Sequence, residues 1–381
     1  MNNIDNFARC ANCGACYNIC PVNAIYVEDT LFYTVKVDTS KCVDCGLCTK
    51  VCPVNNPNDA QQLVGAYSAI HNDAAIVRVS SSGGAFTALS EVVLAQGGIV
   101  YAAAYGDGCR TVEICSTKET SLQSFQRSKY VESKVGLSFR EVKRDLETDR
   151  MVLFCGAPCQ IAGLKRYLIK DYDNLITCDF SCGGMPSHKL FEQYLDNIEC
   201  KLGSPIKEVN FRPKTYGWMQ YAIRIESQNG KVYNRLSKED PFLNSFIYSR
   251  DIMRDYCYEC EFANNHYADI TLADFWKFKQ LSNVRNGDRG ISLLITNSQR
   301  GERMVRSLCK KMAITNLDLQ SASYNMVRKT LDPKRMQARA EFLEECQQKG
   351  FKEATKTRKY PRMWKFRLKY HLYNKWRLNN M

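Results

Sequence analysis

Long apolar runs are missing from this chain, and so is a secretory start. No apolar stretch approaches the roughly 20 residues that a membrane-spanning helix needs. The first residues, 1–7 (MNNIDNF), lack the basic start and the apolar run of a signal peptide. A chain of 381 residues that carries 19 cysteines without these features is predicted to lie in a reducing cytoplasm, where thiols stay free to bind metal.

The sequence also has little excess charge outside its C-terminal end. Ten Lys and Arg residues and one acid, Glu353, lie between Gly350 and Met381, so this segment holds most of the net charge of +13. The remainder is near neutral, which speaks against a basic surface spread over a nucleic-acid-binding domain. With 45% apolar residues, the chain is long enough to bury a core in two or three domains.

Cysteine is abundant, and eight cysteines form two copies of one run. The spacing C-x2-C-x2-C-x3-C-P occurs at residues 10–21 and again at 42–53. This spacing holds paired [4Fe-4S] clusters, in which the fourth cysteine of each run binds the cluster of the other run. The predicted ligands are Cys10, Cys13, Cys16 and Cys52 for one cluster, and Cys42, Cys45, Cys48 and Cys20 for its mate.

Zinc is the alternative for such thiols, because C-x2-C pairs also build tetrahedral sites. Zinc sites, however, separate two pairs by a long gap, whereas here three cysteines lie within seven residues in each run. The two runs therefore resemble the bacterial dicluster ferredoxin module. A radical enzyme that uses S-adenosylmethionine is disfavoured, because its C-x3-C-x2-C spacing is absent.

Hydrophobic periodicity predicts the secondary structure of the rest. Residues 24–38 alternate as a β-hairpin with a turn at 28–30, and the polar segment 54–59 marks a domain boundary near residue 60. Strands are predicted at 64–70, 99–105, 151–155, 175–180, 206–211, 222–226, 231–235 and 290–297. Helices are predicted at 85–96, from residue 161, after residue 187 and at 333–348, with helices filling the remainder.

Three loops carry residues suited to a site. The turn Ser81-Ser82-Gly83-Gly84 precedes a predicted helix, and backbone N–H groups at a helix start suit a phosphate or pyrophosphate. A serine N-cap with glycines in a tight turn is the alternative. Cys159 and Cys182 each follow a strand in a loop that opens a helix, which is typical of sites rather than cores.

Several loops together resemble one family, the beta subunit of coenzyme F420-reducing hydrogenases and dehydrogenases, joined here to a dicluster ferredoxin. The matching stretches span roughly residues 63–300 and are 81–84, 128–130, 156–160, 182–187, 212–218, 257–260 and 269–276. The resemblance implies FAD and a third [4Fe-4S] cluster. Gly183 and Ala273 depart from the family pattern, which often has histidine and glycine there, so F420 itself stays open as the substrate.

The resemblance also implies a domain order and a fold. Residues 1–60 are the ferredoxin-type domain, 61–145 and 146–320 are the two parts of the F420 hydrogenase beta-subunit-like region, and 321–381 are a helical basic tail. The expected fold class is α+β, with a small dicluster ferredoxin domain followed by a larger mixed α/β flavin-binding domain and a helical C-terminal tail.

The resemblance implies cofactor ligands as well. The third cluster is expected on the cysteines of the matching motifs, namely Cys159, Cys182, Cys257 and Cys260. A redox dithiol or zinc is the alternative for the last two. The remaining cysteines are expected to be small hydrophobic residues of the core, namely Cys109, Cys115, Cys155, Cys178, Cys200, Cys309 and Cys346.

The expected FAD contacts come from two loops. Ser82, Gly83 and Gly84 are expected to meet the pyrophosphate through backbone N–H groups, and Lys129 to add a charge there or near the flavin ring. An ordinary exposed lysine is the alternative for Lys129. The segment 212–218, with Arg212, Lys214 and Trp218, either binds an anionic substrate edge and stacks on a ring, or forms a turn with a packed tryptophan.

The expected function follows from the cofactors. Clusters carry one electron at a time and most organic reductions need two, so a flavin is the sensible exchanger between them. The sequence thus predicts an iron-sulfur flavoprotein oxidoreductase that acts on a small organic substrate or an F420-like deazaflavin. A redox partner protein or a soluble electron carrier supplies or takes the electrons. The alternative is an electron-transfer subunit that serves a partner enzyme, and no catalytic residue is predicted.

The basic tail has a helical pattern of its own. Large apolar residues recur every fourth position between Pro361 and Asn380, namely Trp364, Leu368, Leu372 and Trp376. Such a helix either lies peripherally on an anionic membrane or docks on the protein or an acidic partner.

Overall fold

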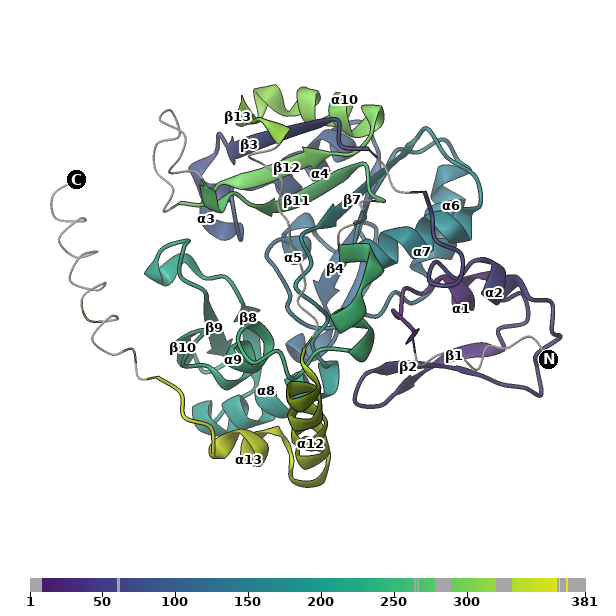
Figure 1. Cartoon of the computed structure of the whole chain (residues 1–381). Helices are drawn as coiled ribbons and strands as arrows, with labels where there is room; N and C mark the ends of the chain where they lie inside the picture. The colour runs from purple at the N-terminus through teal and green to yellow at the C-terminus, as the bar shows by residue number, and fades with distance from the viewer. Residues whose placement is uncertain are drawn as a thin grey trace, which may run out of the picture.

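The computed structural model describes residues 9–59, 62–263, 265, 267–277, 289–319, 331–361, 363 and 368. A small N-terminal unit, drawn in purple, lies beside a larger α/β body (Figure 1). No helix in these ranges is long and apolar enough to cross a membrane. Most of the stripe predicted for the basic tail, including Trp364 and Trp376, lies outside the described residues, and Leu368 is exposed.

The N-terminal unit contains two short helices and one hairpin. Its elements are α1 (Ala15–Ile19), β1 (Ile25–Asp29), β2 (Tyr33–Val37) and α2 (Leu47–Lys50). The predicted hairpin is confirmed, with antiparallel pairs from Ile25 with Val37 to Asp29 with Tyr33. Its turn lies at 30–32 rather than at 28–30, because Asp29 still pairs as a strand residue and the Thr30 hydroxyl donates to the Phe32 carbonyl.

Both helices of this unit begin in the same way. Gly14 precedes α1 and Gly46 precedes α2, each in a left-handed conformation with φ of 92° and 70°. Two residues earlier, Asn12 and Asp44 both have φ of 52°. Positive φ is tolerated best by Gly, Asn and Asp, which explains these residue types. The sequence repeat is therefore also a repeat of backbone conformation.

The larger body is built on one eight-stranded mixed sheet in the order β13-β3-β12-β11-β7-β6-β4-β5. Its four central strands, β11, β7, β6 and β4, run parallel, while antiparallel pairs join the outer strands. The bounds are β3 (Gly65–His71), β4 (Ile99–Tyr105), β5 (Val112–Ser116), β6 (Val152–Cys155), β7 (Leu175–Phe180), β11 (Ile270–Asp274), β12 (Ser292–Thr296) and β13 (Met312–Asn316).

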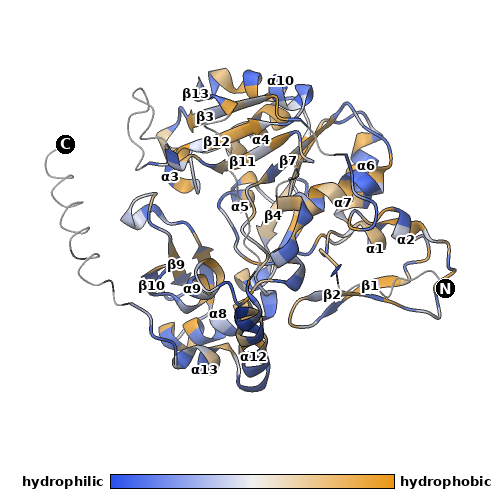
Figure 2. Ribbon diagram, in the orientation of Figure 1, coloured by the Kyte–Doolittle hydropathy of each residue, from blue (hydrophilic) through white to orange (hydrophobic). Residues whose placement is uncertain are grey.

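Helices cover both faces of this sheet. On one face, α4 (Ala85–Ala95) and α10 (Gln299–Ser307) pack on the sheet through Leu153, Ile176 and their neighbours. On the other face, α6 (Ser138–Leu146) and α7 (Pro158–Leu168) pack on Phe154, and this core continues into α1. Figure 2 shows mostly hydrophobic residues on β12, β11 and β4, as expected for strands covered on both faces. Two short helices, α3 (Ala74–Val79) and α5 (Leu122–Phe125), complete this part.

A second core forms away from the sheet, around three phenylalanines. Phe191, Phe211 and Phe242 have ring centroids between 5.2 and 6.0 Å apart, and Phe351 packs edge-on against Phe242. Its elements are α8 (His188–Leu202), β8 (Ile206–Asn210), β9 (Ala222–Ser227), β10 (Val232–Leu236), α9 (Pro241–Ile247), α12 (Pro333–Lys349) and α13 (Phe351–Lys356). The C-terminal helices up to Lys356 are thus part of the core.

The strands predicted at 99–105 and 175–180 have the bounds of β4 and β7, and a mixed α/β fold is confirmed. The sequence pattern does not predict β5, β11 or β13, because five residues with alternating polarity leave little signal. The expectation of helices alone in the remainder is wrong at β13. The helix predicted from Ile161 begins at Pro158, since proline in the first helical position costs no hydrogen bond.

Close contacts hold the N-terminal unit against α6 and α7. A Cβ added to Gly163 of α7 would lie 2.9 Å from the Cys13 Sγ, and one added to Gly14 would lie 2.8 Å from Val135. Arg140 of α6 donates to three carbonyls at the end of α1. These carbonyls have no partner within the helix, so the arginine caps it. Glycines and one arginine therefore fix the unit in place.

Candidate functional site

The first predicted cluster set draws on both cysteine runs. Cys10, Cys13 and Cys16 surround the start of α1, and Cys52 comes from the second run. Burial is the main cause that raises the pKa of Cys13 and Cys16, and repulsion from Cys52 raises the pKa of both further. Thiolates held this close repel one another, and a positively charged iron-sulfur core offsets that repulsion. The structure brings together the four residues that the spacing assigns to one cluster.

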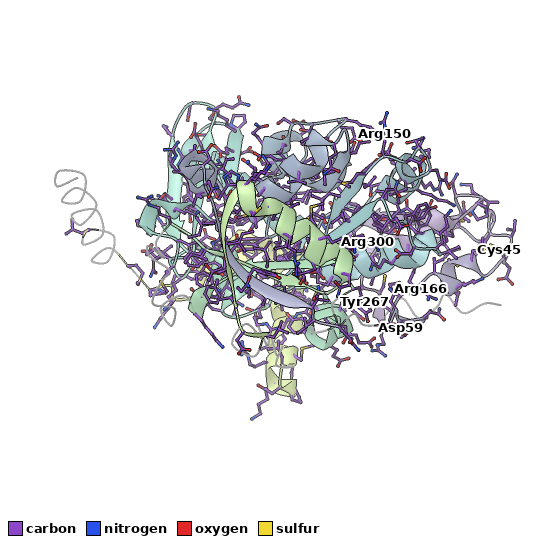
Figure 3. The ribbon with its side chains drawn as sticks, turned by 90° about the horizontal axis from the view of Figure 1, so that it is seen from above. Cys45, Asp59, Arg150, Arg166, Tyr267 and Arg300 are labelled. Atoms are coloured by element: carbon purple, nitrogen blue, oxygen red, sulfur yellow. The ribbon has the colours of Figure 1, made fainter. Side chains whose placement is uncertain are left out.

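The second predicted set lies at the outer end of the N-terminal unit. Cys20, from the first run, shares one small concavity with Cys42, Cys45 and Cys48 from the second run. Cys42 and Cys45 are exposed, and Cys45 lies at the outer edge of the molecule (Figure 3). The crossed assignment of Cys20 and Cys52 thus has a spatial counterpart in both sets.

A third group of four cysteines lies on the larger body. Cys159 is in the first turn of α7, Cys182 is in the loop after β7, and Cys257 and Cys260 lie in and directly after the 3₁₀ turn Asp255–Glu259. After burial, the charges of Cys260, Cys182, Cys13 and Cys257 are the causes that raise the pKa of Cys159. The structure therefore brings together all four residues expected to bind the third cluster, and it places them beside Cys13.

A cubane cluster makes a different demand on the chain than a single ion does. Within the described ranges, no group of three or more His, Cys, Asp or Glu side chains is placed to hold one metal ion. In a [4Fe-4S] cluster each thiolate binds a different iron, so the sulfur atoms are spread around a cube. The donor chemistry of each group, four thiols, fits this cofactor.

Backbone N–H groups point at several of these sulfur atoms. The Asn12 N–H donates to Cys10 Sγ at 3.3 Å and the Ala24 N–H to Cys20 Sγ at 3.3 Å. The Met185 N–H donates to Cys257 Sγ at 3.4 Å. Such bonds stabilise negative charge on sulfur and therefore favour the reduced state of a cluster.

Helix α7 joins the first and third cysteine groups. Cys159 lies one turn before Gly163, and Gly163 is the residue against which Cys13 packs. A side chain at residue 163 would push the N-terminal unit away from the larger body. The absence of one allows the two groups to approach across a single helical turn.

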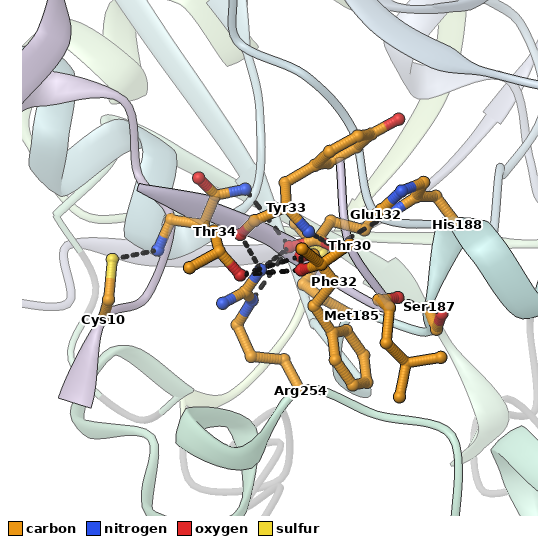
Figure 4. A network of polar contacts seen from close by, with 12 residues as sticks. Cys10, Thr30, Phe32, Tyr33, Thr34, Glu132, Met185, Ser187, His188 and Arg254 are labelled. Atoms are coloured by element: carbon orange, nitrogen blue, oxygen red, sulfur yellow. Dashed lines mark hydrogen bonds and ion pairs between the residues drawn. The ribbon is translucent and has the colours of Figure 1, made fainter. Parts of the chain in front are cut away.

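A buried ion pair lies at the same junction (Figure 4). Arg254 Nε donates to Glu132 Oε1 at 2.8 Å, and the two oxygens of Glu132 also accept from Asn12 Nδ2 at 3.2 Å and the Tyr33 N–H at 3.1 Å. Against the opposing effect of burial, Glu132, Cys10 and then Cys257 raise the pKa of Arg254. The guanidinium therefore lies between the first and third cysteine groups, and its charge acts on both.

The β1–β2 hairpin reaches the larger body beside this pair. The ring of His188 stacks on Tyr33 with centroids 3.5 Å apart, and His188 Nε2 lies 2.6 Å from Asp29 Oδ1. The Ser187 hydroxyl, at the start of α8, donates to the Leu31 carbonyl in the hairpin turn. The N-terminal unit is therefore held at two places, by α6 with α7 and by the start of α8.

A cavity of about 640 Å³ opens at the carboxyl ends of β6, β7 and β11. This edge of a parallel sheet is where open α/β folds bind ligands, and the volume is in the usual range for a small-molecule site. Cys182 of the third group lines the cavity together with Gly183 and Gly184. The third group and the cavity are therefore direct neighbours.

The serine and glycine turn forms one wall of this cavity, but it is also tied to β12. The Gly83 N–H donates to Ser292 Oγ at 3.0 Å, and the Ser82 hydroxyl donates to the Ile291 carbonyl at 2.8 Å. A Cβ on Gly83 would lie 2.4 Å from the Ala69 carbonyl oxygen, so only glycine fits. The Gly83 N–H already has a partner within the protein. Ser82 and Gly84 line the cavity as expected.

Lys129 lines the cavity from the opposite loop. Its ammonium donates to the carbonyls of Phe125, Gln126 and Arg127 at 3.1 to 3.4 Å. Burial, followed by repulsion from Arg127, lowers the pKa of Lys129 to about 7. This is not an ordinary exposed lysine, because its charge is lost close to neutral pH.

The segment 212–218 has a mainly structural role. Trp218 is buried and stacks on Trp276 with centroids 4.6 Å apart. Arg212 forms an ion pair with Asp274 at 2.8 Å and lies over the ring of Tyr221. Of these residues, Arg212, Asp274, Tyr221 and Trp276 line the cavity. Trp276, rather than Trp218, is the tryptophan that faces it.

The remaining cysteines differ in exposure. Cys178 and Cys346 are buried, as expected for small hydrophobic residues, whereas Cys200 and Cys309 are exposed and contradict that expectation. Exposed positions on helical surfaces do not need a hydrophobic side chain, so the residue type alone misled the prediction. Cys155 is half-buried and lines the cavity.

Sequence reasoning did not single out Glu132 or Arg254. Each is one charged residue among ordinary neighbours, and their pairing across 122 positions leaves no local pattern. Trp276 and Asp274 lie in the stretch 269–276 that matched the family, so a signal for them was present. Cys155 and Cys178 occupy equivalent positions at the ends of two neighbouring strands, which the sequence alone does not reveal.

Comparisons with known proteins identify two regions. Residues 149–321 match the family described as the C terminus of the beta subunit of coenzyme F420 hydrogenase/dehydrogenase, and residues 9–56 match the 4Fe-4S dicluster domain. A chain of the F420-reducing [NiFe] hydrogenase complex from Methanosarcina barkeri aligns with 75% of this chain and 93% of its own, with a TM-score of 0.47 and 17% identity. No curated protein matches significantly.

Proposed function

Residues 149–321 belong to the coenzyme F420 hydrogenase/dehydrogenase beta-subunit family and residues 9–56 form a dicluster domain for two [4Fe-4S] clusters, and from this premise we propose an iron-sulfur flavoprotein oxidoreductase. In this proposal, electrons pass between the dicluster domain, a third [4Fe-4S] cluster and FAD. The organic substrate is a small hydride acceptor or donor, such as a deazaflavin of the F420 type.

One observation carries the proposal: the cysteine groups and the cavity are arranged in sequence through the molecule. The exposed group with Cys42 and Cys45 lies outermost, the group with Cys13 follows, and Cys159 adjoins Cys13 across α7. Cys182 of the third group then lines the cavity. This order supports a path for single electrons from the surface to a ligand.

The fit of FAD rests on the cavity. Its volume, its position at the carboxyl ends of the parallel strands, and the start of α4 with Gly84 in its wall favour a ligand with an anionic phosphate part. When bound, a flavin exchanges single electrons with clusters and electron pairs with organic substrates. The residues of the chain position the ring: Trp276 and Tyr221 offer aromatic faces, and Lys129 offers a charge.

The test of the function is spectroscopic. We expect the anaerobically purified chain to be brown-yellow, to release FAD on acid treatment, and to show reduction of the flavin when a one-electron donor is added. Matched protein with Gly83→Ala is expected to lose most of its flavin, because the new methyl group displaces the turn from the Ala69 carbonyl. Wild-type protein that binds iron and no flavin would refute the FAD assignment.

The third cluster predicts a specific iron count. Wild-type protein is expected to hold about twelve irons, and Cys257→Ser with Cys260→Ser about eight, because only the third cube loses its ligands. Iron and acid-labile sulfide per chain are the measurements. Cys200→Ser with Cys309→Ser, two exposed cysteines, is the control and is expected to match wild type. A count of about eight that does not change in the first variant contradicts the third cluster.

Binding of FAD is expected to depend on pH through Lys129. The pKa of this lysine is lowered to about 7, and an anionic ligand beside it raises that pKa, so binding takes up a proton. Affinity should therefore be highest below pH 7 and fall by up to about tenfold for each pH unit above it. Dissociation constants measured by flavin fluorescence from pH 6 to 9 test this.

Lys129→Met should remove most of this pH dependence and weaken binding below pH 7. Lys134→Met is the matched control, since Lys134 lies over the Tyr33 ring away from the cavity. Equal pH profiles in wild type and Lys129→Met would show that this ammonium does not act on the ligand.

A second function, an electron-transfer subunit for a partner enzyme, is favoured by the exposure of Cys42 and Cys45. Exposed cluster ligands suit exchange with another protein. The two functions differ in what the isolated chain does. A chain that reduces a deazaflavin or another small acceptor by itself supports the enzyme, whereas flavin reduction without turnover of any small acceptor supports the subunit.

A further inference from the structure

Cys155 and Cys178 end up side by side at the carboxyl edge of the large sheet. The two residues are direct partners in the parallel pairing of β6 with β7. Residues in register on neighbouring strands point to the same face, and both side chains belong to the core on the α4 side of the sheet. Cys155 is the last residue of β6, where the strand meets the cavity.

The two thiols are in contact. Cys178 forms a side-chain hydrogen bond with Cys155, and both thiols are free. Neighbouring strands lie about 4.8 Å apart, which is within the range of Cα separations that a disulfide bridges. A bond between the two sulfur atoms therefore requires little movement of the backbone.

The surroundings make this pair different from packed hydrophobic residues. Cys178 is fully buried, whereas Cys155 is half-buried and faces the cavity, so one sulfur is shielded and the other is accessible. The Lys129 ammonium, on the opposite cavity wall, has Cys115 and Cys155 as electrostatic neighbours. A nearby cation and partial exposure are the conditions under which a thiol becomes reactive.

We propose that Cys155 and Cys178 are a redox-active dithiol that opens onto the cavity. On oxidation each thiol loses one proton, the pair gives up two electrons, and one S–S bond forms. On reduction the S–S bond takes up two electrons and two protons and returns to two thiols. The electron pair is exchanged with a two-electron carrier of the flavin class in the cavity, and this last clause rests on the proposed function.

Such a pair gives the chain a store for two electrons next to the cavity. The clusters deliver electrons singly, and a dithiol accepts or releases them only as a pair. With the dithiol present, a reduced site keeps its two electrons without releasing them one at a time to a chance acceptor. The pair also leaves the third cysteine group untouched, because Cys159 and Cys182 lie in the loops beyond the strand ends.

The experiment uses the full chain, purified without oxygen, with its iron content measured in every sample. The protein is equilibrated with mixtures of oxidised and reduced dithiothreitol, quenched with acid, unfolded, alkylated and digested with trypsin. The peptides 151–165 and 171–189 hold the two cysteines, and fragment ions separate Cys155 from Cys159 and Cys178 from Cys182. The variants are Cys155→Ser and Cys178→Ser, with Cys115→Ser as the control.

The ratio of linked to open Cys155–Cys178 is expected to rise about tenfold for each tenfold rise in oxidised over reduced dithiothreitol, at constant iron content. The link is expected to be absent in both serine variants and unchanged in Cys115→Ser. The proposal is overturned if both thiols are alkylated at every ratio, or if a link appears only in step with iron loss. A chain without flavin leaves this readout unchanged, so failure of the flavin assignment is distinguishable.

Discussion

A Cys52→Ala variant is expected to lose the same cluster as a Cys10→Ala variant, although the two cysteines come from different runs. Each single change should remove about four of the about eight irons of the dicluster domain, because each breaks one cube. The double variant of Cys10 and Cys52 should lose no more than either single variant. A double variant of Cys10 and Cys20 should lose about eight, because these two residues belong to different groups in the structure.

The measurement is iron and acid-labile sulfide per chain after anaerobic purification, with visible absorbance as an independent readout. Cys309→Ala, an exposed cysteine on the larger body, is the control and should retain all iron. The reverse order, with the larger loss in the Cys10 and Cys52 pair, would mean that each run holds its own cluster. The comparison of double variants therefore decides the crossing even if single changes weaken the fold.

Glu132→Gln is expected to detach the N-terminal unit from the larger body. The change leaves the Arg254 guanidinium buried without its charge partner, and breaking one side of a buried ion pair costs about 3–5 kcal/mol. Glu132 is 1% exposed and also accepts from Asn12 and the Tyr33 backbone, so the loss falls on contacts between the two parts. Opening of the junction should become about a hundredfold to a thousandfold more frequent.

Limited proteolysis of the segment 54–65 under native conditions reports this opening, since cleavage follows the population of the open form. Glu132→Gln combined with Arg254→Met should recover most of the loss, because it removes the unpaired charge. The matched control is Glu261→Gln, which removes an exposed ion pair to Arg9 across the same junction and should cost less than about 1 kcal/mol. Equal cleavage rates in the two single variants would contradict a special role for the buried pair.

The cysteine groups show how far sequence reasoning reaches. The first eight cysteines follow a fixed spacing, so their grouping, including the exchange of Cys20 and Cys52, is predictable from the sequence. The third group came only from a family resemblance, because Cys159, Cys182 and Cys257 are far apart in sequence and meet through the order of the strands. Spacing carries information only where the chain itself is the scaffold.

The cavity wall shows why the rest could not be predicted. The identity of Trp276 rather than Trp218 as the exposed ring depends on which side of a packed pair faces the cavity, and both lie in family-like stretches. Lys129 was predicted as a site residue, but its three carbonyl partners and its lowered pKa follow from tertiary burial. The contact of Cys155 with Cys178 depends on strand register, which no local pattern fixes.

The outward position of Cys42 and Cys45 has a consequence for the stability of the metal centres in air. Oxidants reach the outermost cube first, whereas Cys13 and Cys159 are shielded by α1 and α7. Exposure to oxygen is therefore expected to strip the chain in order, beginning with the cube that includes Cys20 and ending with the one beside the cavity. A partner that covers this edge would act as a lid against corrosion as well as a source of electrons.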